Sequence, residues 1–423
     1  MTDQIIAAPI DGQQKQSRGF SRYQSILVAL LALVQFTIII DFMIMSPLGA
    51  IIMPALNISA AQFGVAVSAY AFSAGLSGLL AAGFADRFDR KRLLLFFYVG
   101  FTLGTAVCAF APNYHVLLSG RIVTGLFGGV IGSVVIAIVT DLFELRLRGR
   151  VMGFVQTAFA ASQVLGIPAG LFLSNHWNWH VTFGALVGLS IVGMIAVLFL
   201  MKPVNGHLSL KQDRNPFRHL VGTVAQPRYW PAFVVTTLLA TGGYMLMPFG
   251  SAYTVHNLGI DIAHLPTIYL VSGLFSIFIG PLVGRLSDTF GKYPTFAFGS
   301  AMSIVMVLIY THLGQVSLSV AILVNVLMFV GIFSRMIPSQ AVISAIPDAA
   351  QRGSFNAISA SLQQLSGGIG SVAAAAIIAE NPDGSLRHFD WLGYVVVTTA
   401  LISLVVMYFV QKPVALQAGK RVI

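Results

Sequence analysis

Long apolar segments separated by short polar loops occupy the chain from about residue 25 to residue 411. Each has the roughly 20 residues that an α-helix needs to cross the ~30 Å hydrocarbon core of a bilayer. Lipid offers the backbone no hydrogen-bond partner, so every segment should be helical. The pattern predicts an all-α polytopic membrane protein with twelve transmembrane helices, at 25–51, 62–84, 93–112, 116–140, 151–174, 180–201, 230–253, 266–286, 294–313, 317–340, 354–379 and 391–411.

One long polar interruption divides these segments six and six. It covers residues 202–229 and contains Pro203, Pro216 and Pro227. A polar stretch with several prolines is typical of a linker. The predicted order is an N-terminal tail, a six-helix bundle, the linker, a second six-helix bundle and a C-terminal tail, at 1–24, 25–201, 202–229, 230–411 and 412–423.

The two halves repeat one another weakly at an offset of about 202 residues. Asp41-Phe-Met-Ile-Met matches Gly243-Tyr-Met-Leu-Met, and in the loops that follow Asp86 matches Asp288. The offset corresponds to six helices, an even number, so the halves are parallel repeats. Substrate sites in such proteins lie at the repeat interface near the middle of the membrane.

Composition agrees with this class, and the charges indicate an orientation. The chain is 57% hydrophobic and 9% charged, with a mean hydropathy of +0.84. Of its 24 lysines and arginines, 21 fall in the tails, the linker and the loops at one end. The positive-inside rule makes that end cytoplasmic, with both termini there. The net charge of +10 then reflects topology and anionic lipid rather than nucleic-acid binding. We expect no cleavable signal peptide, and the single Cys108 excludes an intramolecular disulfide.

The loops after spans two and eight resemble the marker loop of the major facilitator superfamily, Gly-x-Leu-x-Asp-Arg-x-Gly-Arg-Lys. The first copy runs from Ala82 to Lys91 and replaces both glycines, the second of them by Asp89; the copy at 284–292 keeps both. The resemblance covers about 20–415 and implies a cytoplasmic latch between the bundles, whereas a solvated turn that only sets topology is the alternative. The residues concerned are Asp86, Arg87, Arg90, Lys91, Gly284, Asp288 and Gly291.

Two further segments extend the resemblance. Span five contains Gly166, Pro168 and Gly170, similar to the end of the antiporter branch's signature, which implies export. Glycine and proline within a membrane helix also serve close packing and bending in general. Span four carries Arg121 followed by small residues, as in the family. In this family spans one and four both line the central cavity.

Asp41 is the residue that most needs an explanation. An Asp near the centre of a membrane helix costs about 2.5–3.5 kcal/mol and usually faces a polar cavity or a charge. Counting along the helices places Asp41 and Arg121 at similar depth, and neither is matched in the second half. Burial raises the pKa of a carboxyl group and a nearby Arg lowers it, so conformational change can couple to proton binding. Asp41 is therefore interpreted as a proton carrier, as a direct ligand of a cationic substrate, or as a structural partner of Arg121.

Thioether, aromatic and sparse polar side chains near Asp41 predict an adaptable, largely apolar cavity, although methionines at this spacing also suit plain packing. The predicted cavity residues are Gln35, Met43, Met45, Tyr244, Met245, Asn325 and Arg335. Arg335 is interpreted either as a ligand of an anionic substrate or as part of the inner gate. We expect no metal site, no cofactor besides the proton gradient, and no enzyme activity.

The favoured function is proton-coupled export of a small lipophilic or amphipathic solute by alternating access, from a bacterial inner membrane and as a monomer. It resembles the drug and sugar efflux branch of the family. Two alternatives remain open. One is a uniporter or importer of a sugar-like or other small metabolite in which Asp41 is structural. The other is a non-transporting membrane sensor on the same scaffold.

Overall fold

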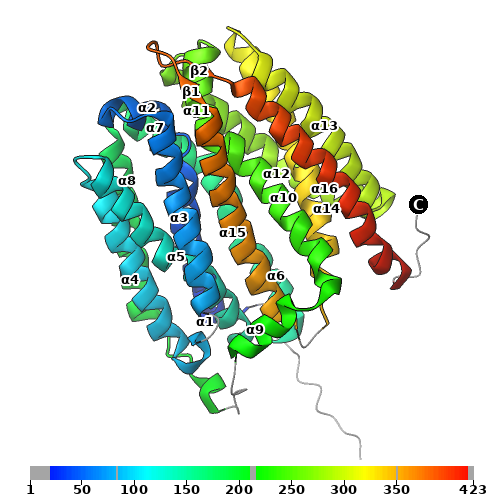
Figure 1. The fold of residues 1–423 in the computed structure, drawn as a ribbon. Helices are drawn as coiled ribbons and strands as arrows, with labels where there is room; N and C mark the ends of the chain where they lie inside the picture. Colours follow the sequence, from blue (N-terminus) through cyan, green and yellow to red (C-terminus); the bar gives the residue numbers. More distant parts are fainter. Residues whose placement is uncertain (1–19, 82–83, 210–215, 349–350, 418–423) are drawn as a thin grey trace, which may run out of the picture.

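The computed structural model of the chain describes residues 20–81, 84–209, 216–348 and 351–417, and in these ranges it is almost entirely helical (Figure 1). The first half contains α1 (Arg22–Ile44), α2 (Gly49–Leu56), α3 (Ala60–Ala81), α4 (Arg90–Ala109), α5 (Tyr114–Leu142), α6 (Leu145–Ala161), α7 (Ile167–His176) and α8 (Trp179–Leu200). The second half contains α10 (Trp230–Leu246), α11 (Gly250–Ala252), α12 (Leu265–Phe290), α13 (Lys292–His312), α14 (Leu318–Ser344), α15 (Arg352–Ile377), the short strands β1 (Ala379–Glu380) and β2 (Leu386–Arg387), and α16 (Phe389–Gln417). The predicted tails lie largely outside the described residues.

Eleven helices among the described residues are long and apolar enough to cross a membrane. The one predicted span outside this set, 354–379, corresponds to α15, a helix of 26 residues rich in serine and glycine. Figure 1 shows α15 running beside α3 and α10 over a similar length. Its lower hydropathy fits this place between the two halves, where it packs against both α3 and α10. We call the end where α1 begins and α16 finishes the terminal end, and the opposite end the far end.

The linker contains a helix that the sequence analysis did not predict, α9 (Pro216–Val224). Pro216 opens this helix, at a position where its missing N–H costs nothing. Leu220 packs with Tyr229 and Phe355 in a small apolar cluster at the terminal end of the second half. The linker is therefore anchored to that half through α9.

Two spans predicted as continuous helices are broken at the far end. The predicted span 25–51 ends as α1 at Ile44, and α2 begins after a turn that contains Pro47. The predicted span 230–253 ends as α10 at Leu246, where a short 3₁₀ turn contains Pro248. Proline lacks the N–H that continues a helix, and the two prolines lie within one residue of corresponding places in the repeat.

These two breaks meet and close the far end. Ser46 donates a hydrogen bond to the carbonyl of Met247, and Ser251 donates to the carbonyl of Ser46 at 2.9 Å. Farther out, the amide of Ala60 at the start of α3 donates to Glu380 Oε2 on β1 at 3.3 Å. The far ends of the halves are thus joined by hydrogen bonds as well as by packing.

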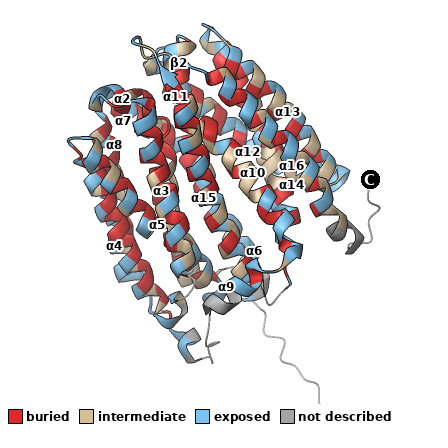
Figure 2. Cartoon of the chain, in the orientation of Figure 1, coloured by how far each residue is buried: buried red, intermediate tan, exposed pale blue. Residues whose placement is uncertain are grey.

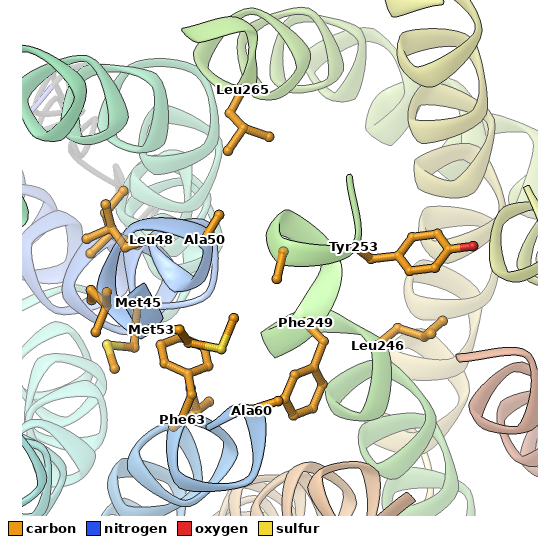
Figure 3. Packing of buried hydrophobic residues seen from close by; sticks show 14 of the residues in the cluster. Met45, Leu48, Ala50, Met53, Ala60, Phe63, Leu246, Phe249, Tyr253 and Leu265 are labelled. Atoms are coloured by element: carbon orange, nitrogen blue, oxygen red, sulfur yellow. The ribbon is translucent and has the colours of Figure 1, made fainter. Parts of the chain in front are cut away.

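The largest buried apolar cluster lies at the same end and draws on both halves. Figure 3 shows Phe63 and Ala60 of α3 beside Phe249 of the second half, with Met45 and Leu48 nearby. The next cluster in size belongs to the first half and its linker alone. In Figure 2 buried residues follow the faces that neighbouring helices turn towards one another. In this structure the far end is therefore the sealed one.

Candidate functional site

Asp41 and Arg121 form an ion pair inside the first half. Arg121 Nη1 lies 2.8 Å from Asp41 Oδ2, and both side chains are fully buried, at 0% exposure. Thr105 of α4 donates a hydrogen bond to Asp41 Oδ1 at 3.2 Å. The contact predicted from helix depth is confirmed. The pair joins α1 to α5 within one bundle.

Arg121 is only partly satisfied by these contacts. Its Nε and Nη2 atoms are buried and have no hydrogen-bond partner among the described residues. Its Cζ atom lies 4.7 Å from the centre of the Tyr70 ring, on α3. A cation over an aromatic face gains about 2 kcal/mol where water is excluded. The ring of Tyr70 is therefore the second stabilising partner of Arg121.

An aromatic series leads from this pair to the second half. The Tyr70 ring centre lies 5.2 Å from that of Phe42, which in turn lies 5.7 Å from that of Tyr244 on α10. Tyr244 donates a hydrogen bond to Gln364 Oε1 on α15 at 2.9 Å. Phe42 follows Asp41 directly in the chain. A movement of Asp41 would therefore displace the Phe42 ring and change its contacts with Tyr70 and Tyr244. Sequence reasoning missed Phe42, Tyr70 and Gln364 as site residues because none carries a charge, although Phe42 is aligned with Tyr244 in the repeat.

Span five packs closely against α1 at the level of Asp41. It consists of α6, a π-helical segment (Ser162–Gly166) and α7, which begins just before Pro168. A Cβ atom added to Gly166 would lie 2.5 Å from Ile40, and one added to Gly170 would lie 2.7 Å from Ile44. The glycines of this motif therefore allow contact with the residue that precedes Asp41. The π-helical segment is a local irregularity of a kind often found at functional sites.

The predicted cavity residues occupy three different environments. Of the seven, Tyr244 makes the cross-bundle contacts described above. Met43, Met45 and Met245 belong to the apolar cluster at the far end, and Met45 is fully buried (Figure 3). In this structure these methionines pack the closed end rather than line an open cavity.

The remaining three are polar. Gln35 has a buried Oε1 with no hydrogen-bond partner among the described residues. Asn325 Oδ1 accepts a hydrogen bond from Ser272 of α12 at 2.9 Å. Arg335 donates to Ser403 Oγ of α16 at 3.0 Å and lies 5.9 Å from the ring centre of Phe296 on α13. These contacts lie within the second half, and Arg335 Nε is buried without a hydrogen-bond partner among the described residues. The gate or anion-binding role of Arg335 stays a prediction.

The marker loops at the terminal end make contacts within each half. Arg90 Nε lies 2.9 Å from Asp141 Oδ2 and ties α4 to the end of α5, while Lys91 donates to the carbonyl of Leu198 at 2.8 Å. In the second copy Lys292 pairs with Asp288 one turn away. Arg87 and Gly284 lie on the surface of the protein or close to it, and the side chain of Asp86 lies outside what the structure describes.

Two positions in these loops have a clear local reason. Gly291 has a φ angle of +103°, which strongly favours glycine, where α12 gives way to α13. Asp89, which replaces a glycine of the pattern, caps α4 by accepting from the amide of Arg92 at 2.9 Å. Its other oxygen accepts from the amide of Val204 in the linker at 2.7 Å. Sequence reasoning treated Asp89 only as a departure from the motif.

Replacing Tyr70 tests whether its ring stabilises Arg121. Tyr70→Leu removes the aromatic face and is expected to destabilise the protein by about 2 kcal/mol or more, with a loss of transport. Tyr70→Phe keeps the face and should retain most of the stability and activity. Thermal unfolding in detergent and transport in vesicles measure both. Equal losses in the two variants would contradict the assignment.

Comparison with known proteins adds the family and the fold. A family model described as Major Facilitator Superfamily matches residues 31–371. The chain is 26% identical over 269 residues to the uncharacterized MFS-type transporter YceJ of Bacillus subtilis (strain 168), covering 63% of this chain and 68% of that protein. It is 21% identical over 281 residues to Multidrug resistance protein 2 of the same organism, covering 65% and 70%. Among solved structures, a bacterial homolog of the human lysosomal transporter Spinster has a TM-score of 0.69 at 16% identity, covering 93% and 96%.

Proposed function

The chain belongs to the Major Facilitator Superfamily, and we propose that this transporter is a proton-coupled exporter of a small lipophilic or amphipathic solute. It is a multi-pass membrane transporter of small molecules and not an enzyme. The proposal concerns the coupling ion, the direction and the substrate class. It also places the terminal end in the cytoplasm of a bacterial cell, following the distribution of basic residues.

The observation that carries the proposal is the incomplete satisfaction of the buried Asp41–Arg121 pair. A pair that only holds helices together is expected to have its remaining hydrogen-bonding atoms satisfied, because an unpartnered buried polar atom costs about 1–3 kcal/mol. Here two nitrogens of Arg121 have no hydrogen-bond partner among the described residues. Such a site is suited to change its protonation and its partners. This favours the hypothesis that Asp41 carries a proton over the hypothesis that it is only a structural partner of Arg121.

Coupling between proton and substrate would pass through the aromatic series. Protonation of Asp41 removes the charge that attracts Arg121, and Phe42 lies next to Asp41 in the chain. Phe42 and Tyr244 are both partly exposed and belong to different halves. Their rings and the amide of Gln364 suit an amphipathic or aromatic solute better than a sugar. A solute bound against the exposed edges of these two rings would contact both halves, as alternating access requires.

Export is supported by the Gly166–Pro168–Gly170 segment, which resembles the antiporter branch, and by the relative named as a multidrug resistance protein. With the terminal end in the cytoplasm, the structure is closed towards the outside. Opening to the outside requires separation of the two helix breaks at Ser46 and Ser251. A proton arriving from the outside would then reach Asp41 and promote return to the closed arrangement.

Transport in reconstituted vesicles tests the coupling. Purified protein would be tested with tetraphenylphosphonium, a fluorescent neutral amphiphile and lactose, each with and without an imposed proton gradient. We expect the gradient to drive at least one amphipathic probe against its own concentration gradient. Transport that ignores the proton gradient would contradict coupling and favour a uniporter, whereas no transport of any probe would favour a sensor.

A further inference from the structure

A groove of about 500 Å³ lies at the terminal end, away from Asp41. Its walls come from α3, the linker helix α9, the start of α10, and α15. Leu80, Val224, Ile358 and Leu362 are among the aliphatic side chains that line it. Figure 1 shows α9 lying beneath α3 and α15 at this end. The volume lies within the usual range of small-molecule sites, about 300–1,000 Å³.

The lining offers a ligand almost no hydrogen bonds. Apart from the hydroxyl of Ser361, the only side chain in the lining with a hydrogen-bonding group is Trp230. The indole N–H of Trp230 is already taken by the carbonyl of Val224 at 2.8 Å. A polypeptide placed here would leave its backbone polar groups unsatisfied, at several kcal/mol each. An alkyl chain carries no such groups, so the chemistry of the lining selects an alkyl chain.

The groove is continuous with the contact between the two halves. A Cβ atom added to Gly75 of α3 would lie 2.8 Å from Leu365 of α15, and one added to Gly78 would lie 3.3 Å from Ser361 Oγ. Because Ser361 and Leu365 also line the groove, its shape depends on this close approach of α3 and α15. An occupant would therefore favour the arrangement of the halves seen here. It would do so without touching the ion pair.

The groove is also open to the bilayer at a defined depth. Leu80 is 49% and Trp230 is 59% exposed, so both side chains face the surrounding lipid. Tryptophan at the end of a membrane helix is typical of the headgroup level. We propose that the groove binds the alkyl chain of a single-chain amphiphile from the leaflet at the terminal end, with its polar head beside Trp230. This site is separate from the proposed transport site and does not rest on proton coupling.

Fluorescence of Trp230 gives a direct test. The other three tryptophans, Trp177, Trp179 and Trp391, lie at the far end. A C18 fatty acid with two bromines close to its carboxyl group would be titrated into the full-length protein in lipid nanodiscs, because bromine quenches tryptophan on contact and the head group is placed beside Trp230. The quenching attributable to Trp230 is the difference between wild type and Trp230→Phe. We expect it to saturate and to be reversed by the unbrominated fatty acid; quenching that rises linearly and is not reversed would show ordinary annular lipid and overturn the proposal.

A matched pair of variants locates the binding. Leu80→Asn introduces an amide into the groove and should weaken the apparent affinity at least about tenfold, since a polar group is placed against the alkyl chain. Leu76→Asn makes the same change one turn earlier on α3, at a residue that is 54% exposed and is not among the groove's lining residues. It should leave the affinity unchanged. Both positions are exposed, so neither change disturbs the core, and equal effects of the two would refute the location.

Discussion

Asp41→Asn is expected to abolish substrate-induced proton release and gradient-driven accumulation. The amide nearly preserves the shape of the side chain. Its oxygen can accept from Arg121 and its NH2 group can donate to the Thr105 hydroxyl, so the protein should fold. It cannot take up a proton in the working pH range. For a neutral solute exchanged against one proton, 100 mV supplies about 2.3 kcal/mol, or roughly a 50-fold accumulation at 1.4 kcal/mol per tenfold. The Asp41→Asn variant should show no accumulation driven by the proton gradient.

Two measurements check this expectation. Proton release is followed with a pH indicator when a transported probe is added to purified protein in weak buffer. Accumulation is then measured in vesicles with an imposed gradient. Thr105→Val is the matched control, because it removes one hydrogen bond to Asp41, worth about 1 kcal/mol, and keeps the carboxylate. Proton release that persists in Asp41→Asn would remove Asp41 from the carrier role.

The transmembrane helices could be predicted from the sequence because lipid allows only one way to satisfy a spanning backbone. The breaks at Pro47 and Pro248 were missed, although two prolines within one residue of corresponding places in a repeat are a usable signal. Helix α9 was missed because the sequence pattern of a nine-residue helix is a weak signal compared with that of a membrane span about three times as long. Its proline at the first helical position could have revealed it.

The ion pair could be predicted because two charges in lipid need one another and helix rise gives their depth. Its surroundings could not. Rotation of each helix about its axis decides that Tyr70 faces Arg121 and that Arg335 faces α13 and α16. The hydropathy pattern of the sequence does not reveal either orientation. The methionines near Asp41 were equally ambiguous, since the same side chains suit a cavity wall and a closed apolar seal.

Arg121→Met is expected to destabilise the protein by about 3–5 kcal/mol, because it leaves the buried carboxylate of Asp41 without its countercharge. Asp41→Leu should be costly for the mirror-image reason. The double variant, Asp41→Leu with Arg121→Met, replaces both charges by apolar groups and should recover much of the loss. Unfolding of all four proteins in detergent gives the coupling energy, expected at up to about 3 kcal/mol. Additivity within about 0.5 kcal/mol would mean that the two residues do not interact in the folded protein.

The same double variant distinguishes a proton-carrying role of the Asp41–Arg121 pair from a purely structural role. Apolar replacement of a buried ion pair is often neutral or stabilising, so a purely structural pair can be replaced without loss of function. If Asp41 carries the proton, the recovered double variant folds but does not accumulate substrate under a proton gradient. Transport of a probe down its own gradient serves as the control for an intact pathway. Gradient-driven accumulation in the double variant would instead assign the pair to the scaffold and place proton coupling elsewhere in the chain.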